Sequence, residues 1–396
     1  MFVELPADDD PRRQEVRKWL EEHPDPTGQD LAEAGYIVPH WPRPWGLDAD
    51  PMLQLVIEDE LRRADVRRPI NPVGTGHCGP ILLMHGTEEQ KDRYLPPMLS
   101  GEEIWCQLFS EPEAGSDLAA VATRARREGD EYVVTGQKTW TSLGHLARFG
   151  ILLARTNPEA PKHEGLSYFI IPMDLPGVEV RPIVDMTGWH SFNDVFFSDV
   201  RLPAENLIGE ENRGWVLAKE TLANERVTLS RDGAQWGWGP TARDLADVVR
   251  EQGGAPDPAM RQRVAQLYID GEICRIYGLL NVARKIQGTP AESSAAILKA
   301  LNDPHGQDVF RLARDLAGTA GMLQEAGPLG SATGWWTQGF LFSPALTVGG
   351  GTTEVLRNII AERALGLPRE PDVDAGRPWS ASRAERVEVT AGSGPT

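Results

Sequence analysis

The first quarter of the chain, residues 1–104, carries apolar positions at helical spacing. Apolar residues recur three and four positions apart over 15–22 and again over 51–64, as in helices that bury one face. Thr87 and Gln90 have the spacing of a capping box, which predicts that a helix begins there. These features predict a helical N-terminal unit.

The pattern changes between residues 105 and 210. Short runs of β-branched and aromatic residues are separated by Gly, Pro, Asn and Asp, with no helix-length segment between them. This texture is typical of an antiparallel sandwich or barrel. It disfavours a doubly wound parallel sheet, which needs a helix between successive strands. The predicted strands cover 132–135, 150–154, 166–171, 178–184 and 195–200.

Helical texture returns in longer pieces after residue 211, and helices of this length pack side by side as a bundle. Asp303 and Pro304 predict a helix start, because Pro is favoured in the first turn after a capping residue. Residues 371–396 are poor in apolar side chains and are predicted to form a flexible tail. The predicted fold class is α+β, with domains over 1–104, 105–210 and 211–370.

Composition and charge exclude several classes of protein. The 396 residues include 58 acidic and 40 basic side chains, a net charge of −18, which argues against a nucleic-acid or anionic-membrane surface. Apolar runs are too short to span a bilayer, and the N-terminus lacks a signal peptide. Cys78, Cys106 and Cys274 are too few for a disulfide framework or a zinc site. We therefore expect a cytoplasmic protein with reduced thiols and no metal.

Two segments of the middle region carry residue types suited to a flat, phosphate-bearing ligand. The turn Ser110-Glu-Pro-Glu-Ala-Gly-Ser-Asp117 leaves backbone N–H groups unpaired and open to a phosphate. The run Gly136-Gln-Lys-Thr-Trp140-Thr-Ser142 places an indole beside hydroxyls that could bond an aromatic cofactor. A plain surface turn and a core Trp would look the same, so both interpretations stay open on these residues alone.

Together, the two segments resemble the flavin-binding signature of acyl-CoA dehydrogenases. The resemblance continues through 195–203, 206–209 and 212–215, and returns in Gly349-Gly-Gly-Thr-Thr-Glu354. It implies an N-terminal α domain, a β middle domain and a C-terminal four-helix bundle. It also implies bound FAD and the α,β-dehydrogenation of an acyl-CoA thioester to the trans-2-enoyl-CoA. The expected assembly is a homo-dimer or homotetramer, with an electron-transfer flavoprotein as electron acceptor.

The resemblance implies cofactor roles for residues at matching positions of the middle region. Phe109 and Ser110 would face the pyrimidine side of the flavin. Trp140 would cover the isoalloxazine, and Ser142 would bond near N5, which accepts the hydride. Ser116 would meet the FAD pyrophosphate or the path of the substrate.

The C-terminal motif departs from the common family pattern. Many members carry the base, a Glu, directly before Gly-Thr, and here that position is Gly350. The resemblance leaves Gly350 the role of donating its backbone N–H to the thioester carbonyl. Thr352 and Glu354 match positions that contact the FAD of a neighbouring subunit.

A second family pattern carries the base on the first long bundle helix, in a Glu-Arg pair, and Glu225-Arg226 matches it. Ala218, Leu222, Glu225 and Leu229 fall on one helix face, so Glu225 interrupts an apolar stripe. A carboxylate there loses water, which suits a base that works near neutrality. A charged pair on a wet helix face is the plainer interpretation. With the resemblance, Glu225 is the predicted base, and Arg226 is predicted to brace the substrate site.

Functions of other classes stay open at this stage. One is a non-catalytic scaffold subunit of a hetero-oligomeric acyl-CoA dehydrogenase, and another is a flavin monooxygenase or oxidase on the same fold. Glu225 argues against the scaffold. The family's Arg-x-x-Phe-Gly motif has no counterpart at 241–247. This loss resembles actinobacterial sterol and fatty-acid catabolic branches, some of which pair a catalytic subunit with a non-catalytic one, so a hetero-oligomer is a second possible assembly.

Overall fold

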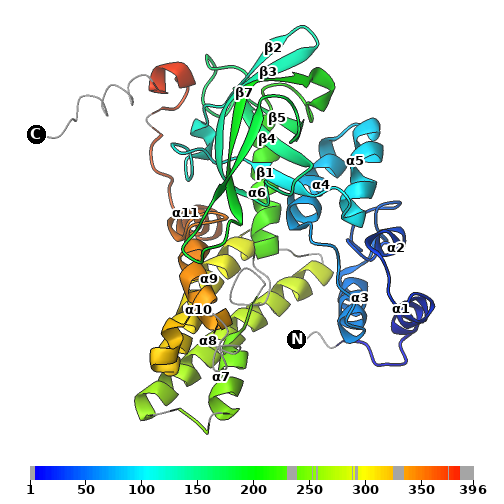
Figure 1. Ribbon diagram of the computed structural model, residues 1–396, viewed down its shortest axis with the longest axis vertical. Coiled ribbons are helices and arrows are strands. Elements are labelled where there is room, and N and C mark those ends of the chain that lie inside the picture. The colour runs from blue at the N-terminus through cyan, green and yellow to red at the C-terminus, as the bar shows by residue number, and fades with distance from the viewer. Residues whose placement is uncertain are drawn as a thin grey trace, which may run out of the picture.

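The structure is a computed structural model that describes residues 5–229, 239–251, 253–255, 257–287, 289, 293–323, 334–372 and 374–383. Helices come first, then strands, then helices again, which confirms the predicted order (Figure 1). The sheet lies at one end of the molecule in this view, and the two helical parts extend from it. Among the described helices, none is both long and apolar enough to cross a bilayer.

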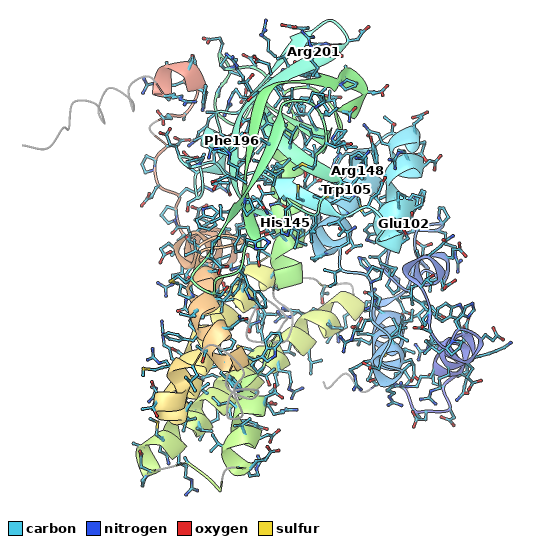
Figure 2. The ribbon with its side chains drawn as sticks, in the orientation of Figure 1. Glu102, Trp105, His145, Arg148, Phe196 and Arg201 are labelled. Atoms are coloured by element: carbon cyan, nitrogen blue, oxygen red, sulfur yellow. The ribbon has the colours of Figure 1, made fainter. Side chains whose placement is uncertain are left out.

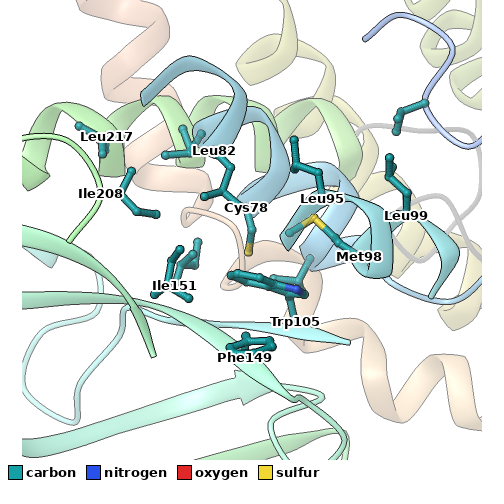
Figure 3. Packing of buried hydrophobic residues seen from close by; sticks show 14 of the residues in the cluster. Cys78, Leu82, Leu95, Met98, Leu99, Trp105, Phe149, Ile151, Ile208 and Leu217 are labelled. Carbon is teal, nitrogen blue, oxygen red and sulfur yellow. The ribbon is translucent and has the colours of Figure 1, made fainter. Parts of the chain in front are cut away.

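The N-terminal part is helical throughout. Its elements are α1 (Pro11–Glu22), α2 (Gly28–Glu33), α3 (Pro51–Arg63), η1 (Gly74–Cys78, a π-helical turn), α4 (Gly79–His85) and α5 (Glu88–Ser100). The predicted capping box is confirmed: Gln90 N–H donates to Thr87 Oγ1, and Thr87 N–H donates to Gln90 Oε1. Leu82, Leu95 and Met98 of α4 and α5 are fully buried and belong to the same core cluster as Trp105 (Figure 3).

The middle part forms a seven-stranded sheet. Its elements are β1 (Trp105–Leu108), η2 (Leu118–Ala120), β2 (Arg124–Glu128), β3 (Glu131–Ser142), β4 (Phe149–Arg155), β5 (Leu166–Pro172), β6 (Val178–Ile183), β7 (Phe192–Pro203) and η3 (Ala204–Asn206). The strand order is β1-β4-β2-β3-β7-β6, with β5 on β4. β4 runs parallel to β1 and β2, whereas the other pairs are antiparallel as predicted. The parallel pairs arise because no hairpin joins β4 to either neighbour.

The C-terminal part contains α6 (Gly214–Leu229), α7 (Ala242–Glu251), α8 (Pro258–Ile286), α9 (Ser294–Ala317), η4 (Gly318–Met322), α10 (Gly334–Phe342), η5 (Ser343–Thr347), α11 (Thr353–Ile359) and η6 (Ile360–Ala364). The predicted helix start at Asp303-Pro304 is wrong, because α9 continues through Pro304. Asp303 does not cap a helix but forms a buried ion pair with Lys299, one turn earlier. Tertiary burial therefore overrides the local proline signal.

The segment 374–383 differs from the predicted flexible tail. Trp379 is 8% exposed, and its Nε1–H donates to Ala120 O at 3.3 Å. The Arg155 guanidinium lies 4.5 Å from the centre of its ring, a distance that allows a cation–π interaction. One indole therefore anchors this segment on the sheet, and residues 373 and 384–396 of the predicted tail lie outside the described residues.

Candidate active site

The candidate base lies where α6, β1 and η1 meet. Glu225, near the end of α6, is half-buried. Gln107 of β1 donates from Nε2 to Glu225 Oε2 at 3.2 Å. The Oε1 atom of the same amide lies 3.0 Å from His77 Nδ1 in η1. Three elements far apart in sequence thus place a carboxylate, an amide and an imidazole in one row.

The buried face of α6 explains why Glu225 points inward. Ala218 is fully buried, and Leu222 packs against the main core, as the helical spacing predicts. Between them Thr221 bonds the Tyr168 hydroxyl at 2.8 Å and its own helix at Leu217 O. Glu225 follows where the buried stripe reaches the surface, so the predicted loss of water is partial in the single chain. The side chain of Leu229 lies outside the described residues.

Arg226 connects the end of α6 with the C-terminal turn η6. Burial lowers the pKa of Arg226, the Glu225 carboxylate opposes that change, and the nearby Arg363 of η6 adds to it. The electrostatic effect of Arg363 on Arg226 places η6 near the end of α6.

The glycine-rich motif forms the turn that starts α11. Gly350 and Gly351 have φ of +64° and +96°, a left-handed backbone that favours glycine. Thr352 caps α11 by accepting from Val355 N–H at 3.2 Å, and Glu354 is exposed in the first turn of that helix. A carboxylate side chain at position 350 would sit on a strained backbone, so the turn is built for glycine.

Trp140 presents a large aromatic face to solvent. A register shift in the β3–β7 ladder between Lys138 and Thr141 places Trp140 at φ +57°, and its side chain is 59% exposed. Its ring contacts Phe192 edge to face at 5.8 Å, and Phe192 stacks on Phe342 of α10 at 6.5 Å. An aromatic row thus runs from the sheet to the helix before the glycine turn, and its first member has an uncovered face.

A buried ion pair supports the turn that begins at Ser110. Lys138 is fully buried and donates from Nζ to Phe109 O at 2.9 Å and to Glu111 Oε1 at 2.8 Å. Glu111 also accepts from the N–H groups of Ala122 and Thr123 at 2.6 and 2.9 Å. Burial raises the pKa of Glu111, but Lys138 and these donors outweigh it and leave the pKa below its usual value.

The structure places the predicted residues of this turn in different surroundings. Phe109 is buried, and Ser110 is half-buried and accepts from Thr139 N–H at 2.9 Å, which joins the turn to β3 beside Trp140. Ser142 is half-buried at the end of β3. Ser116 is exposed, and no contact among the described residues joins it to the others. Its proposed roles therefore stay predictions.

Family profiles match nearly the whole chain. The N-terminal domain of acyl-CoA dehydrogenases matches residues 8–102, the middle domain matches 106–200, and the C-terminal domain matches 212–365. The chain belongs to the acyl-CoA dehydrogenase family. Members of this family are FAD-dependent flavoproteins, and the three-part fold described above is the family architecture.

Several similar proteins come from mycobacteria. The chain is 38% identical to the acyl-CoA dehydrogenase FadE34 of Mycobacterium tuberculosis over 86% of its own length, but it spans only 46% of that relative. It is also 38% identical to IpdE1 of the same organism, over 86% of this chain and 87% of that one. A solved structure described as Tcur3481-Tcur3483 steroid ACAD has a TM-score of 0.79 at 31% identity, and covers 93% of this chain and 100% of that one.

The residues around Trp140 fit the FAD that the family implies. An isoalloxazine needs a flat apolar partner and polar groups at its edges, and Trp140 offers the first. Ser142, two residues further along β3, is half-buried and offers a hydroxyl. An uncovered indole and a partly accessible hydroxyl at one strand end are the groups that a bound flavin would contact.

Sequence reasoning missed the three polar residues that organise the site, Gln107, His77 and Lys138. A signal was available for one of them. Gln107 lies between Trp105 and Phe109 on one face of a strand-like run, which puts a polar group among apolar neighbours. Lys138 lies beyond the predicted strand 132–135, between Gln137 and Thr139, and carried no such signal. His77 carried no comparable signal, because its partner stands 30 residues away.

Proposed function

We propose that the protein catalyses α,β-dehydrogenation of an acyl-CoA thioester to the trans-2-enoyl-CoA, with Glu225 as the base. The supporting observation is the half-buried Glu225 carboxylate, held by Gln107 at 3.2 Å on the side of α6 that faces the sheet. Glu225 would supply the carboxylate that many family members carry at the position of Gly350. A scaffold subunit without a base would have no use for such a carboxylate.

The reaction moves one proton and one hydride. Glu225 removes the proton from the α carbon of the thioester, and the electrons of that C–H bond form the new double bond. The β C–H bond breaks with both electrons on the hydride. Bound FAD supplies the two-electron acceptor at its N5 position. The chain's own tasks are to hold the α carbon near Glu225 and to stabilise negative charge on the thioester oxygen.

Gly350 is the proposed donor to that oxygen. Its N–H belongs to a left-handed turn and makes no hydrogen bond to another described residue. A backbone N–H fixed in a rigid turn is suited to charge that develops in the transition state, because it needs no reorganisation. Arg226, which follows Glu225 on α6, is proposed to brace the same region.

Trp140 is proposed to hold the flavin together with Phe109, Ser110 and Ser142. Replacing Trp140 with Ala removes the flat face and is expected to lower FAD retention about tenfold, since stacking on an aromatic contributes about 1–3 kcal/mol. Trp335→Ala, which truncates a 63% exposed Trp of α10, is the matched control. FAD retained per chain after gel filtration is the measurement, and equal retention in both variants would contradict the assignment.

A second acyl-CoA-dehydrogenase chain is the proposed assembly partner, in preference to a homotetramer. Two similar structures are described as a Tcur3481-Tcur3483 steroid ACAD and a ChsE4-ChsE5 complex, at 31% and 29% identity. FadE34 is more than twice as long as the matched region. Thr352 and Glu354 are proposed to contact the FAD of the neighbouring subunit, and an electron-transfer flavoprotein is the proposed acceptor.

Anaerobic mixing with a panel of acyl-CoA thioesters tests the function. Straight-chain, branched and steroid side-chain thioesters are added to the FAD-loaded protein, alone and with its candidate partner chain. The flavin absorbance band is expected to bleach, most strongly with a bulky steroid-type thioester, since the first solved relative is described as a steroid enzyme. If no member of the panel bleaches the flavin of a fully loaded protein, the scaffold function is favoured instead.

A further inference from the structure

Gln107 carries an amide among apolar neighbours on β1. Side chains alternate along β1, so Trp105, Gln107 and Phe109 share one face, and Trp105 and Phe109 are 0% and 3% exposed in the core that the sheet shares with the helices. Figures 2 and 3 show Trp105 where the sheet meets these helices. Cys106 and Leu108 point to the opposite core. A buried amide at such a position destabilises the fold unless its N–H and its C=O both find hydrogen-bond partners. Gln107 meets this condition with a carboxylate at one end and an imidazole at the other.

The two hydrogen bonds fix the direction of the amide. An ionised Glu225 only accepts, so Gln107 presents its N–H to Oε2 at 3.2 Å. Oε1 then faces His77 Nδ1 at 3.0 Å, and Nδ1 has to carry the proton. The neutral Nδ1–H tautomer and the imidazolium both satisfy this requirement. The row Glu225–Gln107–His77 therefore ends on a hydrogen-bond donor, His77 Nδ1–H, whether the imidazole is neutral or protonated.

The turn η1, which carries His77, is held against β1 by hydrogen bonds to Asn71. His77 is 7% exposed in η1, and Asn71 ties this turn to β1 by accepting from Gly74 N–H at 3.3 Å and from Trp105 N–H at 3.1 Å. Asn71 also donates to Met98 O at 2.9 Å. The imidazole and the strand that carries Gln107 are thus joined through one side chain, which makes the row rigid before any substrate arrives.

We propose that Gln107 and His77 are positioning residues for the base, and that together they keep the Glu225 carboxylate aimed into the site. This inference rests on the proposed function. The Gln107 N–H holds one oxygen of the carboxylate, and the His77 donor keeps that amide from turning over. Loss of the row leaves Glu225 in place but lets its carboxylate rotate away from the α carbon of the substrate.

The test compares kcat and KM of Gln107→Leu, His77→Phe and the control Gln90→Leu in the FAD-loaded enzyme. Gln90 is another buried amide, which bridges Glu205 O and Leu207 O at 2.8 and 3.0 Å, outside the row. Gln107→Leu is expected to lower kcat about ten- to a hundredfold with little change in KM, because a misdirected base slows the chemical step and leaves substrate binding intact. His77→Phe is expected to lower kcat by less.

The outcomes separate the inference from the function on which it rests. A normal kcat in Gln107→Leu overturns the inference, provided that Glu225→Gln is inactive. Full activity in Glu225→Gln overturns the proposed function itself. Reduced folding with a normal kcat per bound FAD, as expected for Gln90→Leu, would make the row merely structural. If Gln107→Leu does not fold, His77→Phe and Gln107→Glu decide, since an ionised second carboxylate cannot donate to Glu225 and repels it, so kcat is expected to fall.

Discussion

Replacing Glu225 with Gln is expected to remove substrate-dependent reduction of the flavin while FAD stays bound. Gln keeps the shape of Glu and a hydrogen bond to Gln107, but it cannot take a proton from the α carbon. General-base catalysis contributes about a hundred- to ten-thousandfold, so the rate of flavin bleaching should fall by at least that range. Stopped-flow absorbance under anaerobic conditions measures it.

Glu220→Gln is the matched control for this prediction. Glu220 lies on the same helix, and its partner is His85 at 2.6 Å, outside the row that holds the base. It is expected to bleach at a rate close to that of the unsubstituted protein. Equal rates in Glu225→Gln and Glu220→Gln would remove Glu225 from the reaction, because the same chemical change would then have no effect at the proposed base.

Replacing Lys138 with Met is expected to lower the free energy of unfolding by about 3–5 kcal/mol, since it leaves the Glu111 carboxylate buried without its cation. Lys138 is fully buried, and Glu111 is 8% exposed. The variant should also lose FAD more readily, because Lys138 supports the carbonyl of Phe109 at 2.9 Å. Chemical denaturation followed by tryptophan fluorescence measures the loss, with FAD content recorded in parallel.

The stability difference between Lys138→Met and the unsubstituted protein is expected to change with pH in one direction. The folded protein holds the pKa of Glu111 below the ordinary value of 4.5, so the ionised carboxylate stabilises the fold above that value. That contribution disappears as the pH falls through the lowered pKa. In Lys138→Met a protonated Glu111 is easier to bury than a charged one. The difference between the two proteins is therefore expected to shrink as the pH falls below 4.5.

Two further variants check why Lys138→Met is expected to lose stability. Lys91→Met removes a cation from a surface pair whose partner Glu88 is largely exposed, and it is expected to cost less than about 1 kcal/mol. Adding Glu111→Leu to Lys138→Met removes the stranded charge and is expected to recover part of the stability. A double variant as unstable as Lys138→Met would mean that packing, and not the unpaired carboxylate, sets the loss.

The sequence predicted most of the middle part because strand signals are local. Runs of β-branched residues gave five of the seven strands, and the small-residue turn after 105–109 pointed to β1. β2 was missed because its residues, Arg-Ala-Arg-Arg-Glu, have little strand propensity and take their place from pairing with β3. The helix start predicted at Pro304 was wrong because the local proline signal was strong, whereas packing in the core lets α9 continue through this residue.

By itself, the sequence determined the order of the three parts, the family resemblance, the glycine at position 350 and the Glu at 225 that we propose as the base. These follow from residue types and short spacings. Only the tertiary structure decided which polar groups meet. Gln107 reaches Glu225 across 118 residues and His77 across 30, and Lys138 reaches Glu111 across 27. Such contacts depend on which strand lies beside which helix, and periodicity along the chain carries no information about that choice.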